Sequence, residues 1–255
     1  MMKVSEIENA LKTLTGESLL AALESYKKDE RTGVLKLVQK YEKKLVELEK
    51  EKEEWKARCA KDATYHQNAL TLVGIDEVGR GPLAGPVVAA AVILPPEAHL
   101  IGVKDSKKLN EEKREALYEA IKEQALGIGI GIVEAQVIDE INILQATFEA
   151  MRRALSYLEI PYDFILVDGD KTIPNVSVPQ EALIKGDDKS AAIAAASIIA
   201  KVTRDRMMRE YTKEYPGYDW ENNKGYGSVK HYEAIHRLGM TPLHRRSFLK
   251  NEGIV

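Results

Sequence analysis

Apolar residues recur at helical spacing through the first 60 residues of the chain. The spacing predicts one short helix after residue 3, a second over residues 16–26 and a third that begins near Val34 and continues past Trp55. Glu and Lys dominate residues 42–56, so this stretch is too polar to bury much surface. The pattern predicts a helical N-terminal extension over residues 1–68.

The period of the apolar pattern changes after residue 69. Short apolar runs bounded by Gly, Pro or Asp predict strands at residues 70–75, 87–94, 127–133, 164–167 and 182–184. Longer amphipathic stretches predict helices at residues 110–124, 138–158, 187–215 and 228–237. Strands followed by alternating helices and strands are typical of an α/β fold, so residues 69–255 are predicted to form one domain with a mixed β-sheet flanked by helices and a helical C-terminal part.

Composition narrows the class of protein. The single cysteine, Cys59, excludes an internal disulfide and a Cys-rich zinc site and fits a reducing compartment, so we expect a cytoplasmic protein. No apolar run approaches the ~20 residues that span a bilayer, and no membrane association is expected. Residues 71–188 carry 11 basic and 20 acidic side chains, whereas residues 189–255 carry 12 and 7. Such a division allows carboxylates to hold divalent cations while Lys and Arg meet a polyanion, although ordinary solvated surface gives the same counts.

Two adjacent carboxylates, Asp76 and Glu77, follow the first predicted strand and precede a Gly-Arg-Gly turn. Successive strand residues point to opposite faces, so both side chains can serve one site only where the strand ends, and Val78-Gly79 supplies such an ending. Neighbouring carboxylates repel each other, and a divalent cation relieves that repulsion. Oxygen ligands of this kind suit Mg²⁺ or Mn²⁺.

Further acidic residues follow the later strands. Asp168 and Asp170 come directly after the strand over residues 164–167, where catalytic groups of α/β sheets commonly lie, although an Asp-Gly turn explains them equally well. Asp187 and Asp188 stand at the expected start of a long helix, where one of them is predicted to cap backbone N–H groups.

Candidate substrate contacts surround these carboxylates in the sequence. Gly79-Arg80-Gly81 can expose backbone N–H groups to an anion, with the Arg80 guanidinium beside them. The cationic residues Lys107, Lys108, Lys201, Arg204, Arg206 and Arg209 could line a nucleic-acid backbone, although helical Lys and Arg are more often solvated and Lys201 can pair with Asp205. Tyr226, between two glycines, could stack on a sugar or base.

Together these motifs closely resemble the bacterial type 2 ribonucleases H, the ribonuclease HII family. The matching segments occur in the family's order over about residues 70–250. They are residues 74–82, 105–109, 139–144, 167–169, 185–187, 195–205, 224–226 and 244–248. The resemblance implies a ribonuclease H-like fold and endonucleolytic hydrolysis of RNA paired with DNA, including incision 5′ of a single ribonucleotide in duplex DNA, with 3′-hydroxyl and 5′-phosphate products.

The resemblance also assigns roles to residues. It implies that Asp76, Glu77, Asp168 and Asp187 are catalytic and bind two divalent ions, Mg²⁺ or Mn²⁺. Gly79, Arg80 and Gly81 would contact the 2′-hydroxyl and adjacent phosphate, and Tyr226 would bind the same hydroxyl and stack on the next deoxyribose. Arg80 favours ribonuclease HII over ribonuclease HIII. We expect a monomer whose partner is nucleic acid.

Two features depart from the family pattern. Asp188 stands where a small residue is expected, which leaves open whether Asp187 or Asp188 is the ligand; we predict Asp187. The extension matches neither the short family form nor the sheet-containing extension of ribonuclease HIII, and either a substrate- or partner-contacting unit or a passive scaffold is consistent with it. Two other classes remain open: a non-catalytic module that binds hybrids, which the full carboxylate set argues against, and a metal-dependent phosphatase of small molecules, which the basic C-terminal part disfavours.

Overall fold

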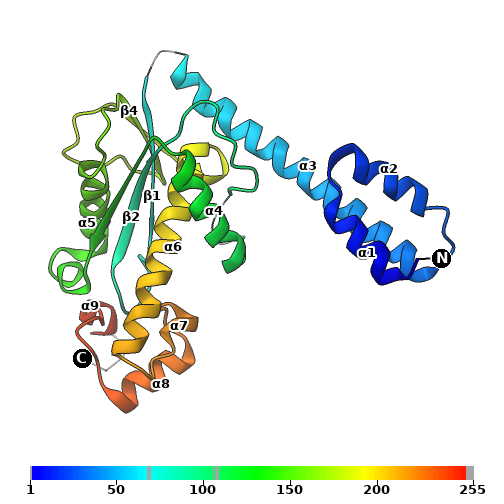
Figure 1. The fold of residues 1–255 in the computed structure, drawn as a ribbon. Helices are drawn as coiled ribbons and strands as arrows, with labels where there is room; N and C mark the ends of the chain where they lie inside the picture. Colours follow the sequence, from blue (N-terminus) through cyan, green and yellow to red (C-terminus); the bar gives the residue numbers. More distant parts are fainter. Residues whose placement is uncertain (1, 68–69, 105, 107–108, 251–255) are drawn as a thin grey trace. The chain divides into compact units, whose positions relative to one another are not determined.

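Two compact units make up the structure, a computed structural model that describes residues 2–67, 70–104, 106 and 109–250 (Figure 1). One unit comprises residues 1–54 and the other residues 55–255. Each unit has its own buried apolar cluster, and the two are described separately below.

The first unit is helical, as the sequence predicts. It contains α1 (Val4–Thr13), α2 (Gly16–Tyr26) and the N-terminal part of α3 (Thr32–His66). Its core consists of one apolar stripe from each helix: Ile7, Leu11, Leu19, Leu23, Val34, Leu37, Val38 and Tyr41. These residues follow the spacing of three and four that places side chains on one helical face, so hydrophobic burial holds the three helices together.

The second unit is built on a five-stranded mixed sheet, which confirms the predicted fold class. The strands lie in the order β3-β2-β1-β4-β5, with β1 antiparallel to β2 and parallel to β4. Their bounds are β1 (Leu72–Val78), β2 (Val87–Ile93), β3 (Gly127–Val133), β4 (Phe164–Asp168) and β5 (Gln180–Leu183). Strand β2, which lies between β3 and β1, is buried along its whole length, which explains its continuous apolar run.

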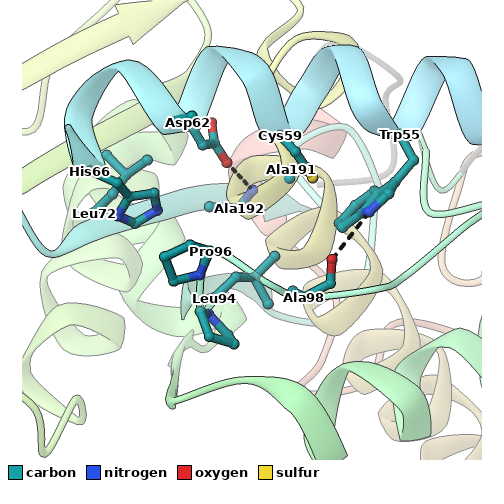
Figure 2. A pocket seen from close by; sticks show the side chains of 12 residues that line it. Trp55, Cys59, Asp62, His66, Leu72, Leu94, Pro96, Ala98, Ala191 and Ala192 are labelled. Carbon is teal, nitrogen blue, oxygen red and sulfur yellow. Dashed lines mark hydrogen bonds between the residues drawn. The ribbon is translucent and has the colours of Figure 1, made fainter.

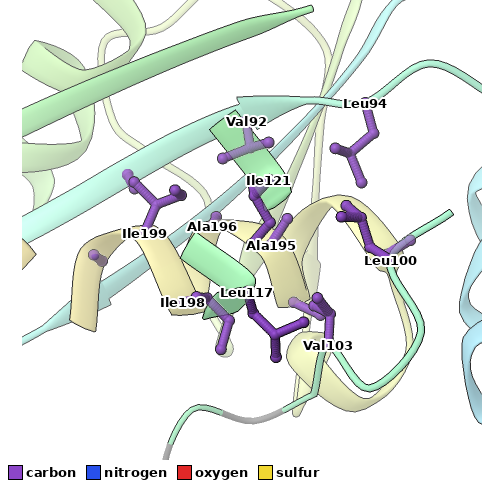
Figure 3. Packing of buried hydrophobic residues seen from close by; sticks show 14 of the residues in the cluster. Val92, Leu94, Leu100, Val103, Leu117, Ile121, Ala195, Ala196, Ile198 and Ile199 are labelled. Carbon is purple, nitrogen blue, oxygen red and sulfur yellow. The ribbon is translucent and has the colours of Figure 1, made fainter. Parts of the chain in front are cut away.

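Helices cover both faces of this sheet (Figure 1). On one face α5 (Ala135–Ser156) packs close to β3, where a Cβ atom on Gly129 or Gly131 would lie 1.9 Å from the Ala154 or Ala150 carbonyl oxygen. These glycines therefore allow the helix to approach the strand closely. On the other face α4 (Glu111–Gln124) and α6 (Ala191–Glu214) share an apolar cluster with β2 that includes Leu117, Ile121, Ile199 and Val92 (Figure 3).

Two predicted helix starts have different outcomes. Asn110 caps α4 as expected, its side chain accepting a hydrogen bond from the Lys113 N–H at 2.9 Å. The prediction that Asp187 or Asp188 begins the last long helix is wrong. These residues form a separate 3₁₀ turn, η2 (Gly186–Asp188), and Ser190 caps α6 by accepting from the Ile193 N–H. The serine hydroxyl is the better-placed cap because it directly precedes the first helical residue.

The C-terminal part is helical, with α7 (Trp220–Asn223), α8 (Val229–Leu238) and α9 (Arg246–Leu249) packed around the buried side chain of Trp220. The sequence pattern predicted α8 but not the single turn of α7. Within the described residues, no helix combines the length and the apolar character that crossing a bilayer requires.

Candidate active site

Two of the predicted carboxylates meet where parallel strands stop pairing. The last registered pair of β1 and β4 joins Ile75 to Val167, and Asp76 and Asp168 are the residues that directly follow. The carboxyl ends of neighbouring parallel strands open onto a shared crevice, which accounts for this meeting. β1 continues beyond the predicted apolar run of residues 70–75 by pairing with β2, and it ends at Val78, where the sequence predicted an ending; its pairing with β4 ends earlier, at Ile75.

All four predicted catalytic carboxylates line one cavity of about 330 Å³. Its walls are formed by Asp76, Glu77, Val78, Ser106, Asp168, Asp187, Ser197, Lys201 and Tyr226. Asp168 also holds the turn that carries Asp187, because its Oδ1 accepts a hydrogen bond from the Gly186 N–H at 2.6 Å. The cavity therefore brings together side chains that are more than 100 residues apart in the chain.

Burial and like charges act together on these carboxyl groups. The pKa of Asp76 lies well above its usual value, first because the group is buried and then because the charges of Glu77 and Asp168 repel its own. The pKa of Glu77 is also raised by burial, although Arg80 acts in the opposite direction through an ion pair at 3.1 Å. A divalent cation would favour the ionised form of both groups.

The donor set fits Mg²⁺ or Mn²⁺, which prefer carboxylate oxygens. This match concerns only the type of ligand. Within the described part of the chain, no group of three or more His, Cys, Asp or Glu side chains is already close enough together to hold a metal ion. Asp188 lies differently from Asp187, with its carboxylate 3.8 Å from the guanidinium of Arg58.

Some of the other residues predicted to contact the substrate also lie at this cavity. Tyr226 and Lys201 line the cavity, and Lys201 forms the anticipated ion pair with Asp205 at 2.7 Å. A Cβ atom on Gly81 would lie 3.6 Å from the Tyr226 ring, so the Gly79–Gly81 turn passes close to that ring. Lys107 and Lys108 lie outside the described residues.

The Gly79–Gly81 turn rests on two buried arginines, Arg204 and Arg245; the sequence offered Arg204 as a cation that could line a nucleic-acid backbone. Arg245 is fully buried and donates hydrogen bonds to the carbonyl oxygens of Gly79, Arg80 and Gly85 at 2.6–3.0 Å. Arg204, also fully buried, donates to the carbonyls of Pro86, Ala84 and Lys224. Gly79 has φ +89°, and a Cβ atom there would lie 2.2 Å from Nε of Arg204, so only glycine fits.

Two more arginines of α6 have acidic partners. Arg206 pairs with Glu115 and Glu119, and Arg209 pairs with Glu111 and Glu115, all on α4. The suggestion that such cations line a nucleic-acid backbone is wrong for Arg204 and stays a prediction for Arg206 and Arg209. Arg204 is buried, and the other two are largely neutralised.

A buried histidine pair supports Tyr226 and was also missed. His231 Nδ1 lies 2.9 Å from the Tyr226 carbonyl oxygen, and Trp220 Nε1 donates to His231 Nε2 at 3.0 Å. His244 Nε2 lies 3.2 Å from the same His231 nitrogen, and His244 Nδ1 accepts from the Thr241 N–H. These partners assign the proton of His231 to Nδ1, which donates to Tyr226. The helical spacing gave no sign of these contacts, because they join α8 to the loops that carry Tyr226 and His244.

Comparison with known proteins also divides the chain into two parts, but after α3 and not within it. A family model described as ribonuclease HII matches residues 73–251, and a second, described as the ribonuclease HII N-terminal domain, matches residues 3–66. The extension thus has a counterpart in the family, which corrects the expectation that it matches no family form. A single sequence cannot reveal an optional domain that only some relatives carry.

Individual relatives agree with this assignment. A ribonuclease HII from Clostridioides difficile is 48% identical, with 97% of each chain covered. Ribonuclease H2 from Pyrococcus horikoshii has a similar structure, with a TM-score of 0.60 and 30% identity over 70% of this chain and 93% of that one. Bst-RNase HIII in complex with Mn²⁺ shares the fold, with a TM-score of 0.59 and 21% identity over 72% of this chain and 68% of that one.

The ordered motifs, the carboxylates at the ends of β1 and β4 and the family matches over both parts of the chain lead to one assignment. The predicted ribonuclease H-like fold is confirmed. The chain belongs to the ribonuclease HII family and is a ribonuclease H, an enzyme that acts on RNA/DNA hybrids.

Proposed function

We propose that this ribonuclease H also incises duplex DNA on the 5′ side of a single embedded ribonucleotide, leaving 3′-hydroxyl and 5′-phosphate ends. The observation that carries the proposal is the cavity in which Asp76, Glu77, Asp168 and Asp187 lie together with Tyr226, beside the Gly79–Gly81 turn. This arrangement places groups able to hold cations next to groups able to bind a 2′-hydroxyl. RNA differs from DNA at that hydroxyl, so one such residue in a duplex provides the recognised feature.

The four carboxylates would hold two divalent ions, Mg²⁺ or Mn²⁺. When bound, the ions activate water and stabilise the leaving 3′-oxygen in an in-line displacement. The protein's own contribution is to fix the carboxylates: the strand ends hold Asp76 and Asp168, and the Asp168–Gly186 hydrogen bond holds the Asp187 turn. The side chain of Ser197 lowers the pKa of Asp76, against the effect of burial, and so supports its ionised form.

Substrate selection would belong to the turn and the tyrosine. Arg245 engages the carbonyl groups of Gly79 and Arg80, so the amide groups of the turn are the part that a phosphate or hydroxyl oxygen would bind. His231 holds the backbone of Tyr226, a residue that is 44% exposed and whose ring can stack on a sugar. Lys107, Lys108 and Lys201 would contact the backbone of the nucleic acid.

The cellular location, the oligomeric state and the domain bounds are also proposals. The enzyme would act as a cytoplasmic monomer, with an extension over residues 1–68 and a catalytic domain over residues 69–255. Since the second compact unit begins at Trp55, the end of α3 contributes to the catalytic unit.

The test is an incision assay on a DNA duplex that contains one ribonucleotide, with Mg²⁺ or Mn²⁺. We expect one cut on the 5′ side of that residue and no cut in the all-DNA duplex. Cleavage of a continuous RNA/DNA hybrid without incision at the single ribonucleotide would refute the finer specificity. No cleavage of either substrate with either metal would refute the metal-dependent mechanism as well.

A further inference from the structure

The last turns of α3, from Trp55 to His66, lie in the same compact unit as the active site although they fall within the N-terminal family match. Several of their side chains contact β5, η2 and the first turn of α6. Asp62 accepts a hydrogen bond from the Ala192 N–H at 2.9 Å, at the first turn of α6 (Figure 2). A carboxylate there stabilises the positive end of the helix that carries Ser197 and Lys201.

Two further contacts attach these turns to the edge of the sheet. The Tyr65 hydroxyl donates to Glu181 of β5 at 2.5 Å, and the Tyr65 ring lies 4.9 Å, centroid to centroid, from the ring of Phe164 at the start of β4. Trp55 anchors the other end of the segment by donating to the Ala98 carbonyl (Figure 2). The end of α3 is therefore fixed on both sides of the point where η2 carries Asp187.

Arg58 lies between these anchors and contacts η2 directly. Arg58 is only 5% exposed, and its Nε donates a hydrogen bond to the backbone carbonyl oxygen of Asp187 at 3.1 Å. Its Nη2 lies 3.8 Å from the carboxylate of Asp188. A buried charged donor forms a strong hydrogen bond, and this bond restrains the backbone of Asp187 without using its carboxylate oxygens.

We propose that Arg58 is a positioning residue that orients Asp187 toward the metal ions and draws Asp188 away from them. The inference rests on the proposed metal role of Asp187. Partners outside the ligand shell set the orientation of ligating carboxylates, and their loss commonly weakens metal affinity by about 10- to 100-fold. The end of the N-terminal domain thus contributes to the metal site of the catalytic unit.

The direction in which Mn²⁺ affinity changes when Arg58 is removed distinguishes a positioning role from a purely electrostatic one. A positive charge near a cation site repels the cation, so on charge alone the removal of Arg58 would tighten Mn²⁺ binding. Loss of positioning would weaken it. A purely structural role would lower the melting temperature and leave Mn²⁺ affinity of the folded protein unchanged.

The experiment measures Mn²⁺ binding to the full-length, metal-free protein by electron paramagnetic resonance, without nucleic acid and well below the melting temperature. We expect Arg58→Ala to weaken Mn²⁺ affinity about tenfold, and the Mn²⁺ concentration for half-maximal cleavage to rise by the same factor. Hybrid affinity in EDTA should remain unchanged. Lys56→Ala, which removes an exposed cation from the same helix, should bind Mn²⁺ as the unsubstituted chain does.

Unchanged or tighter Mn²⁺ binding by Arg58→Ala would overturn the proposal. If that variant does not fold, Arg58→Lys takes its place, and we expect at least about threefold weaker binding because an ammonium lacks the planar fork; unchanged affinity would again overturn the proposal. The variant Asp187→Asn distinguishes a failure of the proposed metal role of Asp187 from a failure of the inference about Arg58. If it binds Mn²⁺ normally, the metal role of Asp187 fails and the inference fails with it. If it loses affinity while the Arg58 variants do not, only the inference fails.

Discussion

The acidic cavity and the arginines behind the Gly79–Gly81 turn are both clusters of buried charge, yet their partners differ in kind. Arg204 and Arg245 donate to backbone carbonyl groups, which carry no net charge and are fixed by the fold. Asp76 instead faces the like charges of Glu77 and Asp168, which raise its pKa. A buried charge satisfied by the backbone supports structure, whereas buried charges that repel one another indicate a site for an ion of opposite sign.

The largest expected effect concerns the acidic cluster. Asp76→Asn keeps the shape of the side chain but removes one anionic ligand, so we expect cleavage of hybrids to fall by more than about 100-fold, beyond the effect of losing an outer partner. Hybrid binding should change little. Single-turnover cleavage and fluorescence anisotropy measure the two quantities, and near-normal turnover would contradict the metal role.

A substitution among the arginines behind the Gly79–Gly81 turn should lower the stability of the protein. Arg245→Met leaves the carbonyls of Gly79, Arg80 and Gly85 without their donor. At about 1–3 kcal/mol for each unsatisfied group, we expect a loss of about 4 kcal/mol in the free energy of unfolding. Urea denaturation measures it, with Arg246→Met as the control because Arg246 is exposed. Equal stability of the two variants would contradict the supporting role of Arg245.

Acid should weaken the C-terminal region through its histidines. Burial lowers the pKa of His244 to about 4, with a further contribution from His231, whereas an unfolded histidine titrates near 6.5. Above pH 6.5 both states are neutral. Between pH 6.5 and 4 the unfolded chain binds the proton and the folded chain does not, so stability falls by up to about 3 kcal/mol.

Urea denaturation as a function of pH tests this prediction, with His244→Gln as the comparison. The variant should lose part of the slope between pH 6.5 and 4. An identical slope in both proteins would show that His244 does not carry the effect.

The smallest expected effect returns to Asp76. Because its folded-state pKa is raised, its ionised form destabilises the metal-free protein at neutral pH. Asp76→Asn should therefore increase the free energy of unfolding in EDTA, although it removes most of the cleavage activity. A decrease in stability would mean that the carboxylate is held by favourable contacts, as the arginines are.

Periodicity and turn residues predicted most of the fold, because burial follows apolar spacing in the helices and strands alike. The start of α6 was misplaced since Asp187 and Ser190 are both good caps and only the η2 turn separates them. The single turn of α7 is too short to show a period.

Only part of the candidate site could be predicted from the sequence. Residues next to strand ends, such as Asp76 and Asp168, were found because their place follows from local sequence. Arg58, Arg204 and Arg245 were missed because their partners are backbone carbonyls more than 15 residues away, and a cation in a polar sequence is normally exposed. Long-range burial of a charge leaves no local pattern.

The most direct test of the central claim is anomalous diffraction from crystals of the protein soaked in Mn²⁺. The account predicts Mn²⁺ peaks within ligand distance of the carboxylates of Asp76, Glu77, Asp168 and Asp187, with Asp188 still facing Arg58. Peaks at Asp188 in place of Asp187, or none in this cavity at Mn²⁺ concentrations that support cleavage, would contradict it.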